Sequence, residues 1–326
     1  PWGPLVQGRG PGGGLVLFAA AGKVTRRPQT AESLAKKTKN IGAMMMPYKV
    51  AFVSLGCAKN LVNTEQMMAL CRDAGHTVTG DPEGADVAVL NTCGFIESAK
   101  SEAIENILEL AQLKDQGKLK KLLVAGCLTQ RYPDDIRKEL PEVDGMLGTG
   151  SYTDVVTAVE ELMAGEHPEH FQRIDRAYDD GERMVTTPPY TAYLKIAEGC
   201  SNGCAFCIIP KLRGRYRSRI MDSLLREARE LEARGTKELI VIAQDITRYG
   251  LDLKDGSSLA GLLKELCKLD FHWIRLHYLY PEVITDELID VIAHEKKIVH
   301  YLDIPIQHCN DRILKAMRRH NTRQEL

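Results

Sequence analysis

The chain has 326 residues, of which 44% are hydrophobic and 27% are charged, and its formal net charge is -1. This composition is ordinary for a globular protein, and the length suffices for two domains with separate cores. Nine cysteines are too few for a disulfide-stapled secreted scaffold, and no run approaches the roughly 20 apolar residues of a membrane span. We therefore expect a soluble, cytoplasmic protein with reduced thiols and no membrane partner.

Residues 1–46 lack the pattern of a fold. They are rich in Gly and Pro at their start and contain seven Lys or Arg against one acidic residue, Glu32. We interpret 1–46 as an unstructured or non-native extension, with the true start at one of the methionines Met44 to Met46; the alternative is a targeting peptide. The rest of the chain has 36 basic and 43 acidic residues, which favours a basic partner over a phosphate backbone.

Residues 47–165 alternate short apolar runs with amphipathic segments, which is typical of an open parallel α/β domain. The predicted strands and helices alternate along the chain. The strands are 49–55, 86–91, 121–125 and 143–147, and the helices are 61–74, 98–113, 134–140 and 153–163. Residues 166–190 are polar and include Pro188-Pro189, so we place an inter-domain linker there.

A second alternating series occupies residues 191–326. Its predicted strands are 192–197, 238–243, 273–278 and 299–304, and its helices are 222–234, 258–269, 286–294 and one that starts at Asp311. Four consecutive βα units predict a (βα) barrel or partial barrel, with its chemistry on the loops that follow the strands. The chain ends inside the last predicted helix, so we expect an incomplete barrel and interpret the chain as a fragment.

Three cysteines, Cys200, Cys204 and Cys207, lie within eight residues at the start of this second series. Three thiolates on one short loop can hold three irons of a 4Fe–4S cluster and leave the fourth iron open, whereas four thiolates close an ordinary ferredoxin cluster. The alternatives are a zinc knuckle or three thiols packed in a core. Structural zinc requires a fourth ligand and usually paired C-x2-C units, so the spacing favours the cluster.

Three further cysteines, Cys57, Cys93 and Cys127, each follow a predicted strand of the first domain, at intervals of 36 and 34 residues. The carboxyl ends of parallel strands meet at one edge of a sheet, where open α/β sheets bind their ligands. The pattern favours a second three-cysteine cluster over three separately packed thiols. We expect Cys71 and Cys267 in the hydrophobic cores and Cys309 near a substrate site, although nothing assigns Cys309 a role.

The run from Glu198 to Cys207 resembles the signature of radical S-adenosylmethionine (SAM) enzymes, including the aromatic Phe206 before the last cysteine. With its second cysteine set in an amino-terminal α/β domain, the chain resembles the methylthiotransferases of that superfamily over residues 48–326. Runs 54–62, 91–99 and 302–308 resemble the branch that modifies an aspartate of small-subunit ribosomal protein S12. The other branch modifies an adenosine of transfer RNA.

This resemblance implies two 4Fe–4S clusters and bound SAM. The second cluster would be held by Cys57, Cys93 and Cys127, and the radical-SAM cluster by Cys200, Cys204 and Cys207. Phe206 would shield SAM and Gln244 would contact it, and an adenosyl radical would remove hydrogen from the aspartate β-carbon. An external electron donor and a sulfur donor would also be needed.

Two departures from the family pattern stand out. Cys309 occupies the place of a serine, and the family's carboxyl-terminal small β-barrel is not in the sequence. The chain as given could therefore be inactive, and direct RNA binding is not expected.

The run 211–219 carries five cations, which either anchor a cofactor or substrate carboxylate or form a solvated or nucleic-acid-binding loop. The rival functions are transfer-RNA methylthiotransferase, a non-catalytic two-cluster electron carrier and a zinc protein.

Overall fold

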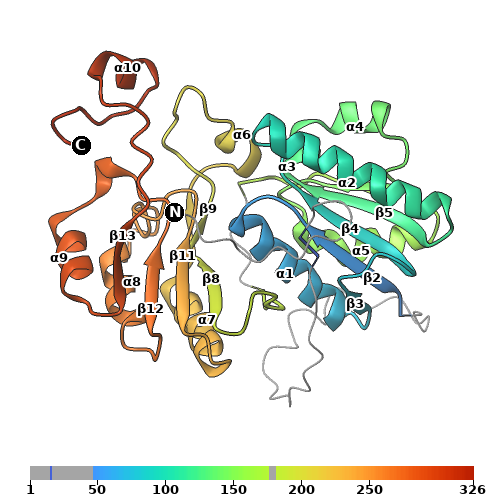
Figure 1. Cartoon of the computed structure of the whole chain (residues 1–326), viewed down its shortest axis with the longest axis horizontal. Coiled ribbons are helices and arrows are strands. Elements are labelled where there is room, and N and C mark those ends of the chain that lie inside the picture. The colour runs from blue at the N-terminus through green and yellow to red at the C-terminus, as the bar shows by residue number, and fades with distance from the viewer. Residues whose placement is uncertain (1–14, 17–46, 176–180) are drawn as a thin grey trace.

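The computed structural model describes residues 15–16, 47–175 and 181–326, which form two α/β lobes side by side (Figure 1). The first lobe contains a seven-stranded sheet in the order β1-β2-β4-β5-β6-β7, with β3 paired to the start of β2. All its pairings are parallel except that of β1 with β2. Its strands are β1 (Leu15–Val16), β2 (Lys49–Ser54), β3 (Thr77–Thr79), β4 (Ala85–Thr92), β5 (Leu119–Gly126), β6 (Gly145–Leu147) and β7 (Glu169–His170).

Helices cover both faces of this sheet because β2, β4 and β5 are apolar on both sides, as is usual for buried parallel strands. Helices α1 (Ala58–Asp73) and α5 (Val155–Met163), the latter preceded by the 3₁₀ turn η1 (Tyr152–Asp154), pack on the face that includes Phe52. Helices α2 (Glu97–Asp115), α3 (Cys127–Arg131) and α4 (Pro133–Glu139) lie over the opposite face, which includes Leu122.

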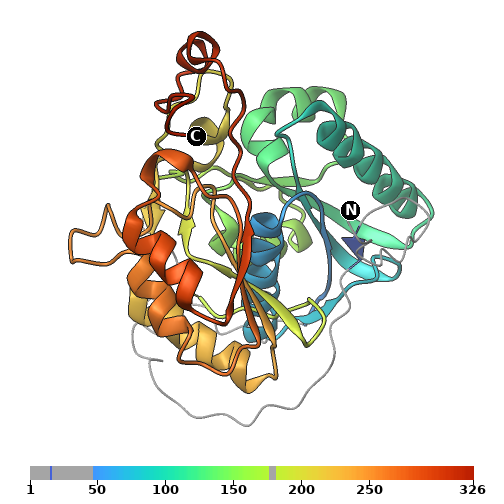
Figure 2. The same cartoon turned by 60° about the vertical axis from the view of Figure 1, so that its left-hand side comes forward.

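The second lobe is built on a four-stranded parallel sheet in the order β13-β12-β11-β8. Helices α7 (Met221–Ala233), α8 (Leu259–Leu266) and α9 (Asp286–His294) pack against one face of this sheet (Figure 2). The strands are β8 (Thr191–Lys195), β11 (Glu238–Ile242), β12 (Trp273–Leu276) and β13 (Ile298–Leu302). The other helices are α6 (Ile209–Arg213) and α10 (Asp311–Ala316), with the 3₁₀ turn η2 (Pro281–Val283) before α9. The predicted order of an open parallel α/β lobe and a partial (βα) barrel is confirmed.

The structure also differs from the predicted elements in detail. β3, α3 and α6 are absent from the prediction because three to five residues are too few to show a hydrophobic period. The predicted strand 192–197 is split into β8 and β9 (Ala197–Glu198), and β9 pairs with β10 (Arg217–Ser218). β7 lies within the predicted linker, and β1 lies within the predicted extension. Among the described helices, none is long and apolar enough to cross a membrane.

Candidate functional site

Cys57, Cys93 and Cys127 lie at one edge of the first sheet, and we call them the N-terminal cysteine site. In the sheet register Ser54 is opposite Asn91, which is opposite Ala125, and each cysteine follows one of these residues by two or three positions. Cys57 directly precedes α1, Cys93 follows β4, and Cys127 begins α3. Cys57 is exposed, Cys93 half-buried and Cys127 buried, so the set is open on one side.

Buried side chains hold these three loops together. The Asn60 amide donates hydrogen bonds of 3.0 Å to the carbonyl of Leu55, directly after β2, and to that of Thr92, the last residue of β4. The Thr92 hydroxyl donates to the Ala125 carbonyl at 2.6 Å, which connects the end of β4 to β5. Gly126 has a φ of +105°, and a Cβ there would lie 2.5 Å from the Thr92 carbonyl oxygen. Only glycine fits where the third loop passes this closely.

Two cationic side chains, Lys59 and Arg213, lie at the N-terminal cysteine site. Cys57 is exposed as a residue, but burial around its sulfur opposes ionisation of the thiol. The nearby Lys59 and Arg213 charges, together with the backbone N–H groups of Asn60 and Lys59, outweigh this burial and hold the pKa of the thiol below its ordinary value. Burial raises the pKa of Cys93, and the neighbouring Cys127 and Cys57 sulfurs contribute to the rise. Arg213 comes from the second lobe and donates to the Cys127 Sγ at 3.4 Å.

Cys200, Cys204 and Cys207 lie on the loop between β9 and α6, and we call them the loop cysteine site. The Asn202 amide, inside this loop, donates to the buried Asp245 carboxylate at 2.8 Å. Gly199 opens the loop with a φ of +80°, and a Cβ there would lie 2.2 Å from the Arg215 carbonyl oxygen. The loop therefore requires glycine before its first cysteine and is fastened from inside by the amide of Asn202.

Two residues far along the chain contact this loop. The Tyr280 hydroxyl lies 3.3 Å from the Cys204 Sγ, and the Arg319 guanidinium lies 3.8 Å from the same sulfur and 3.8 Å from the Tyr280 ring centroid. Burial raises the pKa of the Cys200 thiol to about 11, with smaller contributions from Asp245 and the other two cysteines. The Cys200 thiol therefore needs a bound cation to lose its proton at neutral pH.

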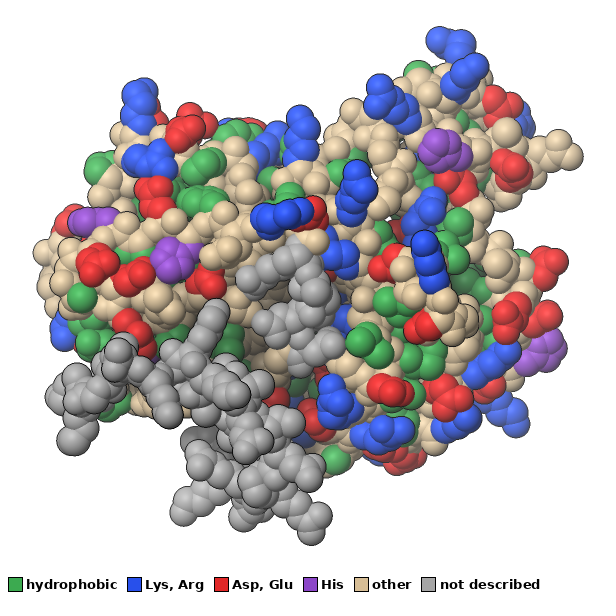
Figure 3. Space-filling model, turned by 180° about the vertical axis from the view of Figure 1, so that it is seen from behind, with side chains coloured by type: hydrophobic (Ala, Val, Ile, Leu, Met, Phe, Trp, Pro, Cys, Tyr) green, Lys and Arg blue, Asp and Glu red, His purple; other side chains and the backbone are tan. Residues whose placement is uncertain are grey.

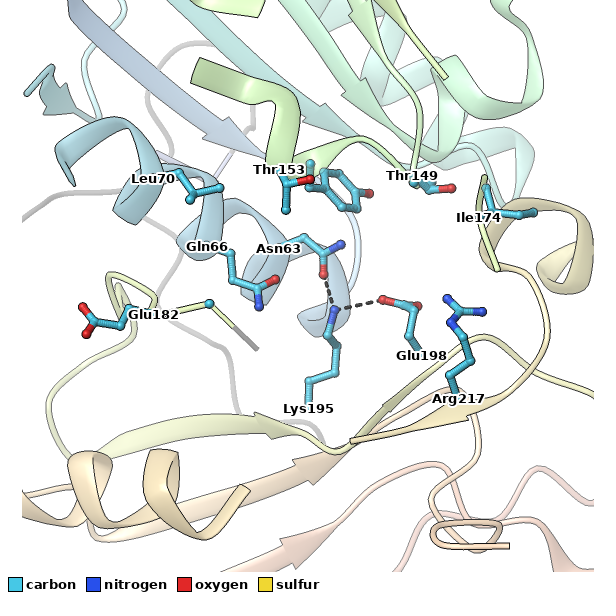
Figure 4. Close-up of a pocket in the computed structure, with 13 residues that line it drawn as sticks. Asn63, Gln66, Leu70, Thr149, Thr153, Ile174, Glu182, Lys195, Glu198 and Arg217 are labelled. Atoms are coloured by element: carbon cyan, nitrogen blue, oxygen red, sulfur yellow. Dashed lines mark hydrogen bonds and ion pairs between the residues drawn. The ribbon is translucent and has the colours of Figure 1, made fainter. Parts of the chain in front are cut away.

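A buried polar network links the two cysteine sites, and Figure 4 shows its Asn63, Lys195 and Glu198 side chains. The Glu198 carboxylate accepts from Lys195 at 2.9 Å, from Arg213 at 3.3 Å and from the Gln244 amide at 2.7 Å. Burial raises the pKa of Glu198, but the Lys195 and Arg213 charges outweigh it and hold the pKa far below its usual range. The Lys195 ammonium also donates to Asn63 on α1, so the network spans both lobes. A cavity of about 90 Å³ beside it contains none of the six cysteines in its lining.

The cationic run 211–219 does not act as one patch. Lys211 and Arg215 are exposed, whereas the side chains of Arg213 and Arg219 are only 3% and 4% exposed and pair with Glu198 and Glu227. On the face seen in Figure 3, the Lys/Arg and Asp/Glu side chains are interspersed. The solvated-loop interpretation therefore fits only Lys211 and Arg215.

The residues of both sites fit an open iron–sulfur cube. Such a cube spreads its thiolate ligands over several irons rather than directing them at one atom. Within the described ranges, no three His, Cys, Asp or Glu side chains are placed to hold a single metal ion. Each site offers three cysteines on a fixed frame, and of the six only Cys127 is buried. At the N-terminal cysteine site the glycine at position 56 leaves room beside Cys93, because a Cβ there would lie 2.6 Å from the Cys93 Cβ.

The remaining predicted residues fall in different surroundings. Cys71 is fully buried in a core, Cys267 is half-buried against the other core, and Cys309 is exposed between β13 and α10. Phe206 is 53% exposed on the cysteine loop, and Gln244 belongs to the buried network. Sequence reasoning named no role for Glu198, Tyr280 or Arg319. Only Glu198 carried a local signal, its place two residues before Cys200.

Comparisons with known proteins agree with this arrangement. Residues 49–148 match Uncharacterized protein family UPF0004, and residues 194–326 match the Radical SAM superfamily. The ribosomal protein uS12 methylthiotransferase RimO of Symbiobacterium thermophilum is 50% identical over 275 residues, which cover 84% of this chain and 57% of the relative. That of Clostridioides difficile is 50% identical over 280 residues, covering 85% of this chain and 63% of the relative. The chain thus spans about three fifths of the length of these relatives.

A solved structure shares the fold at low sequence identity. The radical SAM methyltransferase TsrM from Kitasatospora setae, solved with cobalamin and a 4Fe–4S cluster, superposes with a TM-score of 0.60 at 14% identity, over 86% of this chain and 66% of that one. This likeness concerns the fold alone. With both matches in the predicted order, the second lobe matches the radical SAM superfamily, and over about 85% of its length the chain is similar to RimO-type methylthiotransferases at 50% identity.

Proposed function

We propose that the chain contains the cofactor-binding part of an enzyme that places a methylthio group on the β-carbon of an aspartate in ribosomal protein S12. The observation that carries the proposal is the pairing of two three-cysteine sites through one buried network, with the Arg213 side chain touching both the Cys127 sulfur and Glu198. A protein that only carries electrons would not need a buried network that connects its two cysteine sites. The likeness to uS12 methylthiotransferases supports ribosomal protein S12 as the substrate.

Each cysteine site would hold one 4Fe–4S cluster. The loop cysteine site, Cys200, Cys204 and Cys207, would hold the cluster that binds SAM. The N-terminal cysteine site, Cys57, Cys93 and Cys127, would hold the other cluster. When bound, the clusters and SAM supply a one-electron cleavage that yields a carbon radical, and a sulfur that can be methylated. The protein's own part is to fix the two cysteine loops through the amides of Asn60 and Asn202.

Two further residues have proposed contacts with SAM. Phe206 is the exposed aromatic side chain on the cysteine loop and would cover the cofactor. Gln244 donates its amide hydrogen to Glu198, while its buried Oε1 has no hydrogen-bond partner among the described residues. A buried amide oxygen without a donor is costly, so a polar cofactor group would satisfy it.

The partners follow from charge and chemistry. Residues 47–326 carry more acidic than basic residues, which suits a basic protein such as S12 better than RNA. We propose that the reaction also depends on an external electron donor and on a sulfur donor.

Anaerobic assays separate the two halves of this proposal. The iron-loaded chain is incubated with SAM, sulfide, dithionite and S12, and both 5′-deoxyadenosine and the mass of S12 are measured. We expect C200A/C204A/C207A to abolish both signals, and C57A/C93A/C127A to retain 5′-deoxyadenosine release but lose S12 modification. The Clostridioides difficile relative serves as the positive control. An iron-loaded chain that releases no 5′-deoxyadenosine would contradict the proposal.

A further inference from the structure

Arg213 is a buried cation of the second lobe whose side chain contacts the N-terminal cysteine site. It is 3% exposed, and its Nη2 donates to the Asn60 Oδ1 at 2.5 Å and to the Cys127 Sγ at 3.4 Å. Its Nη1 donates to the Glu198 carboxylate at 3.3 Å. One planar guanidinium thus satisfies an amide, a sulfur and a carboxylate in fixed directions, which a lysine ammonium cannot reproduce.

The backbone around Arg213 fixes this geometry. Arg213 ends α6, and Gly214 follows it with a φ of +75°; a Cβ there would lie 2.7 Å from the Ile174 carbonyl oxygen. The carbonyl of Leu212 accepts a hydrogen bond from the Thr149 hydroxyl of the first lobe. The end of α6 is therefore docked on the first lobe, and the guanidinium has little freedom to leave the sulfur.

Glu198 extends the contact to the loop cysteine site. Its Oε2 accepts from Arg213, while its Oε1 lies 3.3 Å from the backbone nitrogen of Gly199, the residue before Cys200. A single chain of contacts therefore runs from the Cys127 sulfur through Arg213 and Glu198 to the backbone of the other cysteine loop. Charges in such an interior interact more strongly than charges in water.

We propose that Arg213 is a positioning residue that raises the reduction potential of the cluster at the N-terminal cysteine site, and that Glu198 opposes it. The inference rests on the proposed function, because it presumes a cluster on Cys57, Cys93 and Cys127. Reduction adds one negative charge to the cluster. A buried cation that donates to a ligand sulfur stabilises that reduced state, and hydrogen bonds to cluster sulfurs are known determinants of potential. A buried carboxylate nearby acts in the opposite sense.

The test isolates one cluster by using the C200A/C204A/C207A background. Each protein is reconstituted anaerobically and its iron is counted. Its cluster is then reduced stepwise with dithionite in the presence of redox mediators, and the solution potential is recorded at each step. The one-electron-reduced cluster is followed by electron paramagnetic resonance. The variants added to this background are R213M, R213K and E198Q. The matched control is R215K, which changes an exposed arginine two residues away.

We expect R213M to keep about four irons per chain and to shift the potential to more negative values. R213K should shift it less in the same direction, E198Q should shift it to more positive values, and R215K should leave it unchanged. A purely structural role would not produce shifts of opposite sign at Arg213 and Glu198.

Three results would overturn the inference. One is an unchanged potential in an iron-loaded R213M protein, and another is a shift of E198Q in the same direction as R213M. The third is loss of iron from R213K while R215K stays loaded, which would assign Arg213 to holding the cluster instead of tuning it. Failure of the proposed function looks different, because the background protein itself would then bind no iron.

Discussion

Arg183 connects the two lobes through a buried ion-pair cluster, and we expect its replacement by methionine to lower the free energy of unfolding. The guanidinium pairs with Glu65 of α1 and with Glu227 of α7, the latter at 2.7 Å, and also donates to the Tyr193 carbonyl. The side chains of Arg183 and Glu65 are 5% and 0% exposed. Solvent therefore screens this pair little.

The R183M change leaves two carboxylates in different situations. Glu227 keeps a partner, because Arg219 lies 2.5 Å from its other oxygen. Among the described residues, the Glu65 carboxylate keeps only its hydrogen bonds from Thr186, at 2.7 Å from the backbone nitrogen and 2.8 Å from the hydroxyl. Removing one partner of a buried ion pair costs about 3–5 kcal/mol, so we expect the free energy of unfolding to fall by that amount.

The assay is urea unfolding followed by far-ultraviolet circular dichroism. The double variant R183M/E65Q should recover most of the loss, because a glutamine oxygen still accepts from Thr186 and position 65 no longer carries an unpaired buried charge. R173M, at a side chain that is 85% exposed, should unfold like the parent. A loss below about 1 kcal/mol for R183M, or a double variant no more stable than R183M, would refute the reasoning.

Three further predictions concern acid stability and the two cysteine frames. Burial raises the pKa of Asp86, but Lys120 and a backbone N–H outweigh burial, and the net pKa is lowered. The ionised carboxylate therefore stabilises the folded state above the unfolded pKa of about 3.9, and this stabilisation is lost as pH falls through the lower folded pKa. D86N should therefore flatten the pH dependence of the urea midpoint below about pH 4; an unchanged acid slope would contradict this. N202A should release the cysteine loop from Asp245 and lower the iron bound in a C57A/C93A/C127A background by at least half of the roughly four irons of one cube; full iron occupancy would exclude the positioning role. G126A should cost about 1–3 kcal/mol through strain at positive φ, measured by urea unfolding, and parental stability would show that the loop can shift.

The sequence predicted the framework well because its signals are local and periodic. The apolar runs of β2, β4 and β5 placed three cysteines at one sheet edge, and the register bears out this placement. Boundaries were less exact. Helix α1 begins at Ala58, three residues before its predicted start, because its first turn is polar and its apolar period becomes visible only at Leu61.

The cysteine environment was harder to predict because it depends on distant residues. Nothing local distinguishes Arg213 from the other cations of its run; docking of α6 on the first lobe decides which of them is buried. Tyr280 and Arg319 are 76 and 115 residues from Cys204, and no short motif connects them to it. The sequence thus indicates which residues can hold a cluster, while packing between lobes determines which groups surround it.

The most direct test of the central claim, two independent clusters in one chain, is an iron count after anaerobic reconstitution with iron and sulfide. The parent chain should bind about eight irons, and C200A/C204A/C207A and C57A/C93A/C127A about four each, because each cube holds four. Four or fewer irons in the parent, unchanged in C200A/C204A/C207A, would contradict the account.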